Sequence, residues 1–236
     1  MNRGVSLGKA IMIFKPPKNY HKLISKLSLV TFFTTLIFLL VLTKLGYIPV
    51  LNLTDKSVIP PSEKYDKLIE WLLSFGLVPL IGALVVYFIS SAFELHNKVS
   101  KLIGVRYLWD RFFIAKILVE RAGASEELNR KRVKDIMYKL YYPGLKEIDA
   151  HFTLIFWKYA YHFWVIFEHA VIVLLTTLII SRYHHEWDLL YLWLYSFAVI
   201  LLAALQLIFI TGQKSKDQAN QIPQEKLNQF FRLFVS

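Results

Sequence analysis

The sequence contains no cysteine, so disulfide bonds, thiolate metal sites and cysteine nucleophiles are excluded. It also lacks a glycine-rich phosphate loop and the HExxH or HxxxH histidine spacings of metal-dependent enzymes. Its seven histidines are spread along the chain rather than clustered as the ligands of a metal would be. From these absences we expect no catalytic residue, no metal site and no cofactor.

What the sequence has in excess is apolar side chains. Hydrophobic residues make up 56% of the 236 positions and mean hydropathy is +0.43, whereas a soluble domain is roughly 45–50% apolar. Four segments are apolar over the roughly 17–25 residues that a helix needs to cross a bilayer: residues 27–43, 71–93, 162–181 and 189–212. The sequence therefore predicts an all-α fold, an integral membrane four-helix bundle.

The positive charges are distributed unequally among the segments outside these four spans. Of the 28 Lys and Arg residues, 23 lie in the two terminal segments and in the segment between spans two and three, and five lie in the other two loops. Because Lys and Arg accumulate on the cytoplasmic side, both termini are expected inside. The predicted parts are a basic cytoplasmic N-terminus (1–26), spans one and two with an outer loop (27–93, loop 44–70), a helical cytoplasmic insert (94–158), spans three and four (159–212) and a cytoplasmic tail (213–236).

The net charge of +11 follows from this distribution and does not by itself indicate nucleic acid, for which no binding is expected. The basic segments on one side favour contact with anionic lipid headgroups, worth about 1 kcal/mol per cation near the surface. One short run within the insert concentrates this charge, and we expect it to contact lipid or a partner protein: Arg130, Lys131, Arg132 and Lys134.

The insert has a helical pattern with one break. Its apolar spacing predicts that the helix of span two continues into the cytoplasm well past Phe93. A break is expected at residues 122–124, where Gly123 stands between two alanines. Ser125 is the predicted N-cap of a second helix, which should end near Pro143 and Gly144. The tail from Ile222 onward has the pattern of a short amphipathic helix at the membrane interface.

Polar side chains recur at helical spacing on the helix that becomes span three. At about 100° per residue they share one face, which should point to a bundle interior, a subunit interface or a watery cavity. The alternative is that Glu147, His151 and Lys158 are solvated and that His162 reaches the membrane interface. The predicted stripe consists of Glu147, His151, Lys158, His162, His169 and Thr176.

Glu168 lies in the middle of span three, off this stripe. A buried carboxyl group is costly, so it should be protonated, paired or hydrogen-bonded across helices. Lys158, His169 or a residue of another span are the possible partners. Together with His162 and His169 it forms a predicted polar site in the membrane, and both a functional and a purely structural role stay open.

Small residues suggest close helix contacts. In span two they recur every seven residues, at Gly76, Ala83, Ser90 and Asn97, which favours a packing seam for a neighbouring helix. Span one has a small polar face of its own at Ser28, Thr31 and Thr35. Such seams serve packing within one chain or self-association, and we expect a homo-oligomer.

The span count, the basic helical insert and the segment from Glu94 to Asp110 resemble small four-span prokaryotic membrane proteins of antiphage defence systems. The resemblance implies an effector or sensor that acts at the inner membrane with a cytosolic protein partner, and it assigns no residue roles. The leading hypothesis is thus a non-enzymatic oligomeric membrane protein, either pore-like, membrane-perturbing or a sensor subunit, controlled through its insert. One alternative is a small channel or transporter using Glu168 and His169; a second is a membrane-embedded enzyme, which the lack of convergent ligands disfavours.

Overall fold

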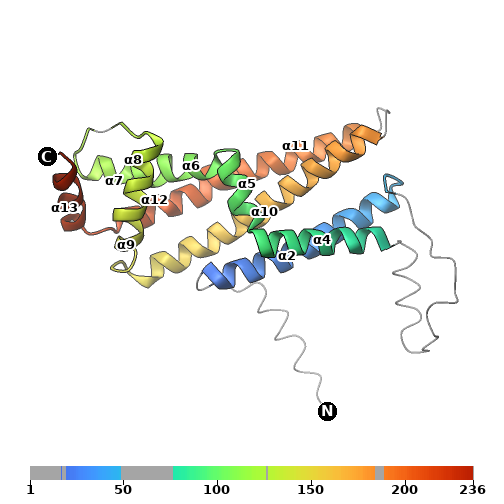
Figure 1. The fold of residues 1–236 in the computed structure, drawn as a ribbon, viewed down its shortest axis with the longest axis horizontal. Helices are drawn as coiled ribbons and strands as arrows, with labels where there is room; N and C mark the ends of the chain where they lie inside the picture. The colour runs from blue at the N-terminus through green and yellow to red at the C-terminus, as the bar shows by residue number, and fades with distance from the viewer. Residues whose placement is uncertain (1–16, 18–19, 49–76, 126, 184–188, 236) are drawn as a thin grey trace, which may run out of the picture.

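The computed structural model describes residue 17 and residues 20–48, 77–125, 127–183 and 189–235, and in these ranges the chain is helical with no β-strand (Figure 1). Elements labelled η are turns of π-helix. In chain order the elements are α2 (Tyr20–Lys44), α4 (Leu77–Phe93), α5 (Leu95–Leu102), α6 (Val105–Trp109), η1 (Asp110–Ala115), α7 (Lys116–Arg121), α8 (Arg130–Asp135), η2 (Ile136–Tyr141), α9 (Tyr142–Gly144), α10 (Ala150–Tyr183), α11 (Leu190–Leu205), η4 (Gln206–Thr211), α12 (Gly212–Asn220) and α13 (Gln224–Val235).

Among the described residues, three helices are long and apolar enough to cross a membrane, and the count rises to four if a bent pair forms one span. The three are α2, α10 and the continuous helix Leu190–Asn220, which joins α11, η4 and α12. They contain the predicted first and third apolar segments and all but the first residue of the fourth. The bent pair is α4 with α5, whose axes differ by 74°. The all-helical fold with candidate membrane spans is therefore confirmed at this level.

The bend lies at Glu94, between α4 and α5, and we call this point the elbow. Glu94 has φ 48° and ψ 61°, the left-handed region that residues other than glycine rarely adopt. Two side chains hold its carboxylate in place, since Tyr20 Oη donates to it at 2.8 Å and Asn97 Nδ2 at 2.9 Å. The helix predicted to continue past Phe93 is therefore interrupted at Glu94, and α5 continues the chain in a direction that differs by 74°.

Residues 105–144, the central part of the predicted insert and from here on called the insert, form two helices joined by a turn. The first, α6–η1–α7, ends at Arg121, and Gly123 follows with φ 64°, which confirms the predicted break. The second, α8–η2–α9, ends at Gly144 as expected. Its N-cap is Asn129, whose Oδ1 accepts a hydrogen bond from the Arg132 N–H at 2.9 Å. Ser125 is thus not the cap, because the helix begins one turn later than its position requires.

The main hydrophobic core joins the insert to the end of the chain. Leu227 and Phe230 of α13 are buried in the same cluster as Ile136 of η2, so α13 packs against the insert, as Figure 1 shows at one end of the molecule. Arg121 reinforces this contact by donating to the carbonyl oxygens of Ala219 (2.8 Å) and Ile222 (2.9 Å). The apolar face of the tail helix therefore packs against the insert.

Away from the insert, α2 packs along α4, and α10 packs along α11 and α2 (Figure 1). Ala83 and Ser90 of α4 are buried, and Ser90 Oγ lies 3.4 Å from Ser28 Oγ of α2. The small residues of these two helices thus allow the close approach that places their polar groups side by side.

Candidate functional site: a cationic cavity beside a buried carboxylate

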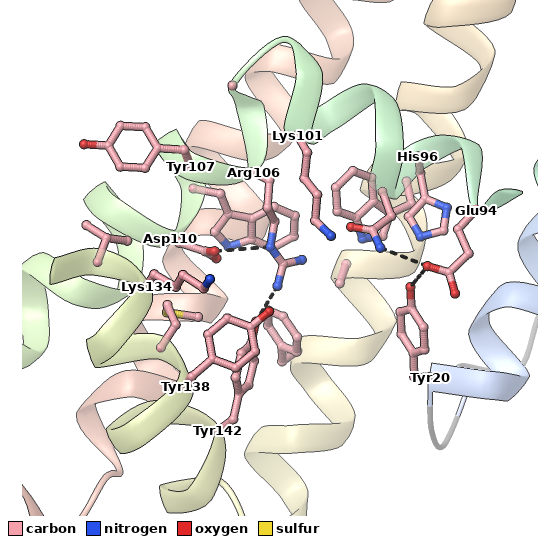
Figure 2. A pocket seen from close by; sticks show the side chains of 18 of the residues that line it. Tyr20, Glu94, His96, Lys101, Arg106, Tyr107, Asp110, Lys134, Tyr138 and Tyr142 are labelled. Carbon is pink, nitrogen blue, oxygen red and sulfur yellow. Dashed lines mark hydrogen bonds and ion pairs between the residues drawn. The ribbon is translucent and has the colours of Figure 1, made fainter. Parts of the chain in front are cut away.

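A cavity of about 710 Å³ lies where the insert meets the ends of the apolar helices. Its lining comes from both parts: Tyr20 begins α2, Trp157 and Trp164 belong to α10, and Lys101 and Lys134 belong to α5 and α8. A volume in the range of roughly 300–1,000 Å³ is typical of small-molecule sites. Figure 2 shows polar side chains from several helices converging on this space.

The charged side chains of the lining are unequal in sign. Four are cationic and two are carboxylates: Lys101, Arg106, Arg130 and Lys134 against Glu94 and Asp110. Both carboxylates already accept hydrogen bonds within the protein, Glu94 as described above and Asp110 from Arg106. The cavity therefore has a surplus of positive charge that its own acids do not neutralise.

Arg106 is the most constrained of the cations. Its Nε donates to Asp110 Oδ2 at 3.3 Å, and its Nη2 donates to Tyr142 Oη at 2.6 Å. Burial disfavours the charged guanidinium, but the negative charge of Asp110 and the contact with Tyr142 outweigh this, and together they raise the pKa of Arg106. The guanidinium is thus held charged and in a fixed position. Two of its five N–H groups donate to Asp110 and Tyr142, and the other three can donate to a ligand.

The neighbours of Arg106 have shifted pKa values as well. Burial raises the pKa of Asp110 above its usual range, and the positive charge of Arg106 offsets only part of this shift. Burial likewise raises the pKa of Tyr142, again against the effect of Arg106. The Asp110 carboxylate is therefore easier to protonate than an exposed one.

Directly beyond this cavity lies Glu168 of α10, whose side chain is 0% exposed. Thr31 Oγ1 of α2 donates to its Oε2 at 2.5 Å, and Ser90 Oγ of α4 lies 2.9 Å from the same oxygen. The backbone N–H of His96 donates to Oε1 at 3.1 Å, and His96 Nδ1 lies at the same distance. Groups from α2, α4 and α5 thus all converge on one carboxyl group of α10, and we call these four residues the Glu168 node.

His96 connects the node with the cavity. It lines the cavity and its ring centroid is 5.1 Å from that of Trp164. Trp164 stacks on Trp109 at 5.5 Å, and Trp109 Nε1 donates to Ser215 Oγ of α12 at 2.8 Å. A continuous series of buried contacts therefore runs from the cavity wall to the node and to the last apolar helix.

The comparisons with known proteins match almost the whole chain. The model of the YmfE protein family matches residues 19–233. The chain belongs to the YmfE family. It is 37% identical over 226 residues to the Escherichia coli (strain K12) protein named "Uncharacterized protein YmfE", a match that covers 93% of this chain and 96% of the relative. No solved structure matches. The relative's name states no activity, so the function of this YmfE-family chain has to be argued from the site.

In this member of the YmfE family, the predicted polar stripe has no common environment. His151, Lys158 and His162 are exposed, Glu147 pairs with Lys226 of α13, and Thr176 is half-buried. His169 is half-buried, and its Nε2 lies 2.9 Å from Tyr195 Oη of α11. It lines a second cavity, of about 590 Å³, between α2 and α11.

Glu168 and His169 therefore have different partners although they are adjacent in sequence. Glu168 contacts α2, α4 and α5, whereas His169 contacts α11. Neither Lys158 nor His169 is a hydrogen-bond partner of Glu168; the partners come from other helices, the third of the possibilities raised by the sequence. Within the described residues, no group of three His, Asp or Glu side chains could hold a metal ion.

The basic run of the insert divides between different environments. Arg130 and Lys134, one helical turn apart, line the cavity. Lys131 is exposed outside it, and Arg132 lies over the rings of Phe230 and Phe231 at 5.2 and 5.6 Å. The i,i+4 spacing explains the division, because only residues about one turn apart share a helix face.

The predicted seam of span two is placed as follows. Ala83 and Ser90 are buried in α4, Asn97 bonds Glu94 at the elbow, and Gly76 lies outside the described residues. The sequence indicated Ser90 and Thr31 as packing residues only, and it gave no reason to select His96 or Lys101 as site residues. All of these residues are polar or charged and lie in or next to apolar segments, which marks them as candidates. The sequence does not indicate which of them contact one another.

Proposed function

We propose that this protein is a non-enzymatic membrane sensor subunit, in which a ligand in the cavity changes how the apolar helices pack. One observation carries the proposal: the insert and the apolar helices line the cavity jointly, with Tyr20 and Trp157 on one side and Arg106 and Lys134 on the other. A ligand that contacts both sides binds one relative arrangement better than another and shifts the population toward it.

Helix α5 is the element that transmits the change. Lys101 on α5 lines the cavity, while His96 on the same short helix bonds Glu168. At its start, α5 is joined to α4 only through the left-handed Glu94. A ligand that displaces Lys101 therefore shifts α5, and with it both the elbow and the Glu168 node. Because α2, α4 and α10 meet at these two places, their packing changes as well.

The membrane topology, the localisation and the partners are proposed from the sequence, and they are compatible with the candidate spans. Helix α4 serves as the second of four spans, residues 94–158, which include α5, and both termini lie in the cytoplasm, and the membrane is the bacterial inner membrane. The basic segments contact anionic lipids, and the protein acts as a homo-oligomer with a cytosolic partner, in antiphage defence. The unequal distribution of Lys and Arg supports this orientation.

A pore or channel relay built on Glu168 and His169 receives less support from the geometry. The two side chains have different partners, and Glu168 is enclosed by donors from three helices. Release of a trapped dye from liposomes that contain the purified protein tests the pore version directly. If release equals that of empty liposomes, the pore version is wrong and the sensor version is unaffected.

The sensor version can be tested without knowing the ligand, because the chain has no cysteine of its own. Tyr138→Cys places one thiol in the cavity lining at an exposed position. Its reaction with the anionic reagent sulfonatoethyl methanethiosulfonate fills part of the cavity. We expect changed hydrogen exchange, followed by mass spectrometry, in α4, α5 and the first half of α10.

The matched control is Lys131→Cys, treated in the same way, because Lys131 is exposed on the neighbouring turns but outside the cavity. Its modification should leave exchange in α4 and α5 unchanged. If modification of the Tyr138→Cys thiol alters exchange only within residues 105–144, the cavity does not communicate with the apolar helices and the sensor proposal fails.

A further inference from the structure

We infer that the ligand of this cavity carries a phosphate group. This inference rests on the proposed function, because it names the ligand class of the same cavity. It is argued from the charges that line the cavity, from the partners those charges already have, and from the position of the cavity along the apolar helices.

The first step is the charge balance. Four cations and two carboxylates line the cavity, which leaves two positive charges in excess. A phosphate monoester carries about −1.5 to −2 at neutral pH, whereas a single carboxylate carries one charge. A phosphate therefore matches the surplus, and a lone carboxylate leaves about half of it unmatched.

The second step is which cations are available. The side-chain ammonium groups of Lys101 and Lys134 form no ion pair or hydrogen bond with any described residue. In Figure 2 the side chain of Lys101 extends into the space between the Arg106 contacts and the Glu94–Tyr20 contact. These two lysines, on different helices, remain free to bind an anion.

The third step is the geometry of Arg106. Asp110 and Tyr142 fix the guanidinium through Nε and Nη2, so its remaining N–H groups present a preset donor pair. A guanidinium with two flanking ammonium groups surrounds an acceptor from several directions. The three oxygens of a phosphate can use such an arrangement, while the two coplanar oxygens of a carboxylate use one direction.

The fourth step concerns the rest of the ligand. Tyr20 at the start of α2 and Trp157 of α10 line the same cavity, and their ring centroids are 6.3 Å apart. Tyrosine and tryptophan at the end of an apolar helix mark the level of lipid headgroups. Two sources of a phosphate monoester can therefore reach the site: a lipid with a terminal phosphate, such as phosphatidic acid, from the side, or a soluble phosphate compound from the aqueous face.

The test measures binding to the full-length protein with defined probes. Inorganic pyrophosphate is titrated by calorimetry into protein in a neutral detergent, and citrate serves as the carboxylate probe. For the lipid source, nanodiscs of phosphatidylcholine with and without phosphatidic acid, whose terminal phosphate is a monoester, are compared by native mass spectrometry for co-retained lipid. Binding of pyrophosphate only, of phosphatidic acid only, or of both supports the inference and identifies the source.

The matched pair of variants is Lys134→Ala and Lys131→Ala, both exposed lysines of α8 of which only Lys134 lines the cavity. We expect Lys134→Ala to weaken binding about tenfold, the size of one charge-assisted contact, and Lys131→Ala to change it less than twofold. Arg106→Lys, which keeps the charge but loses the fork, should weaken binding as well. Unchanged elution in gel filtration confirms that each variant folds.

Three results would overturn the inference: no binding of either phosphate probe, citrate binding as tightly as pyrophosphate, or equal losses in the two lysine variants. The proposed function fails in a different way. If a phosphate probe binds but exchange in α4 and α5 does not change, the ligand class stands and the sensor role is lost. If filling the cavity changes exchange but no phosphate binds, the sensor role stands and the inferred ligand class is wrong.

Discussion

Glu168 of α10 accepts a hydrogen bond, 3.1 Å long, from the backbone N–H of His96 in the first turn of α5. The N–H groups of a first helical turn have no partner within their own helix, and a carboxylate there also interacts favourably with the helix dipole. No side chain of the preceding residue caps α5, because Glu94 makes no such bond. Glu168 therefore supplies from another helix the cap that α5 lacks.

The first prediction concerns this carboxylate. Glu168→Ala should strongly lower the free energy of unfolding, because it leaves the donors of Thr31, Ser90 and His96 buried without an acceptor, at about 1–3 kcal/mol for each group that stays unsatisfied. Glu168→Gln should cost less, since its amide oxygen still accepts from His96. Unfolding by a denaturing detergent measures both.

Glu127→Gln is the control for these variants, since Glu127 is exposed in the turn before α8. It should change the free energy of unfolding by less than about 0.5 kcal/mol. Equal stability of Glu168→Ala and the control would mean that the node does not hold the helices together.

The second prediction compares two glycines at close helix contacts. A Cβ at Gly212 would lie 2.4 and 2.5 Å from ring carbons of Phe113 and 2.7 Å from the carbonyl oxygen of Leu207. Neither the backbone oxygen nor the ring can move away at low cost. Gly212→Ala should therefore destabilise the protein by about 1–3 kcal/mol, measured as a lower thermal midpoint.

Gly144→Ala is the matched comparison. Its Cβ would meet Ile222 Cδ1 at 2.8 Å, which is the flexible end of a side chain, and alanine in a helix gains up to about 1 kcal/mol over glycine. The two effects offset each other, so the net change should be within about 1 kcal/mol. A larger loss for Gly144→Ala than for Gly212→Ala would contradict the contact geometry.

The third prediction is a pH dependence. Burial raises the pKa of Asp110 in the folded protein above its ordinary value of 3.8, so the folded state binds the proton more tightly than the unfolded state. The stability contributed by Asp110 is then fully present below pH 3.8 and is lost as pH rises through the raised pKa. As pH falls from about 7 to about 4, wild type should gain stability relative to Asp110→Asn, which does not titrate. A constant difference between the two would show that this pKa is not raised.

The fourth prediction tests the orientation in the membrane. Lys44, at the end of α2, belongs to the proposed outer side, and Lys116, in α7, belongs to the proposed cytoplasmic side. Because the chain has no cysteine, single variants at the two exposed sites can be labelled cleanly. In intact cells an impermeant maleimide should label Lys44→Cys and should reach Lys116→Cys only after permeabilisation. The opposite result would reverse the proposed topology.

The apolar helices were predictable because a long apolar run is a local property of the sequence. The predicted third span, residues 162–181, lies within α10, and the fourth, residues 189–212, starts one residue before the helix Leu190–Asn220 and otherwise lies within it. The second helix of the insert also ends at Gly144 as predicted. These elements are determined by residues that are close together in the sequence, so a short stretch of sequence is enough to predict them.

The elbow and the node were not predictable in this way. Tyr20 holds the left-handed Glu94 from 74 residues away, and Thr31 reaches Glu168 across 137. The sequence correctly required a partner for Glu168, because an isolated carboxyl group in an apolar helix is costly. Which partner it finds depends on how four helices cross, and that is a property of the tertiary structure alone.

The contacts of Arg121 with Ala219 and Ile222, 98 and 101 residues further along the chain, set an order of events during synthesis. The insert is complete at Gly144, yet the helix that covers its apolar side chains begins at Gln224. Until α13 has been made, side chains such as Ile136 and Met137 lack their final cover. A chain whose synthesis stops before Gln224 would therefore leave these apolar side chains of the insert exposed.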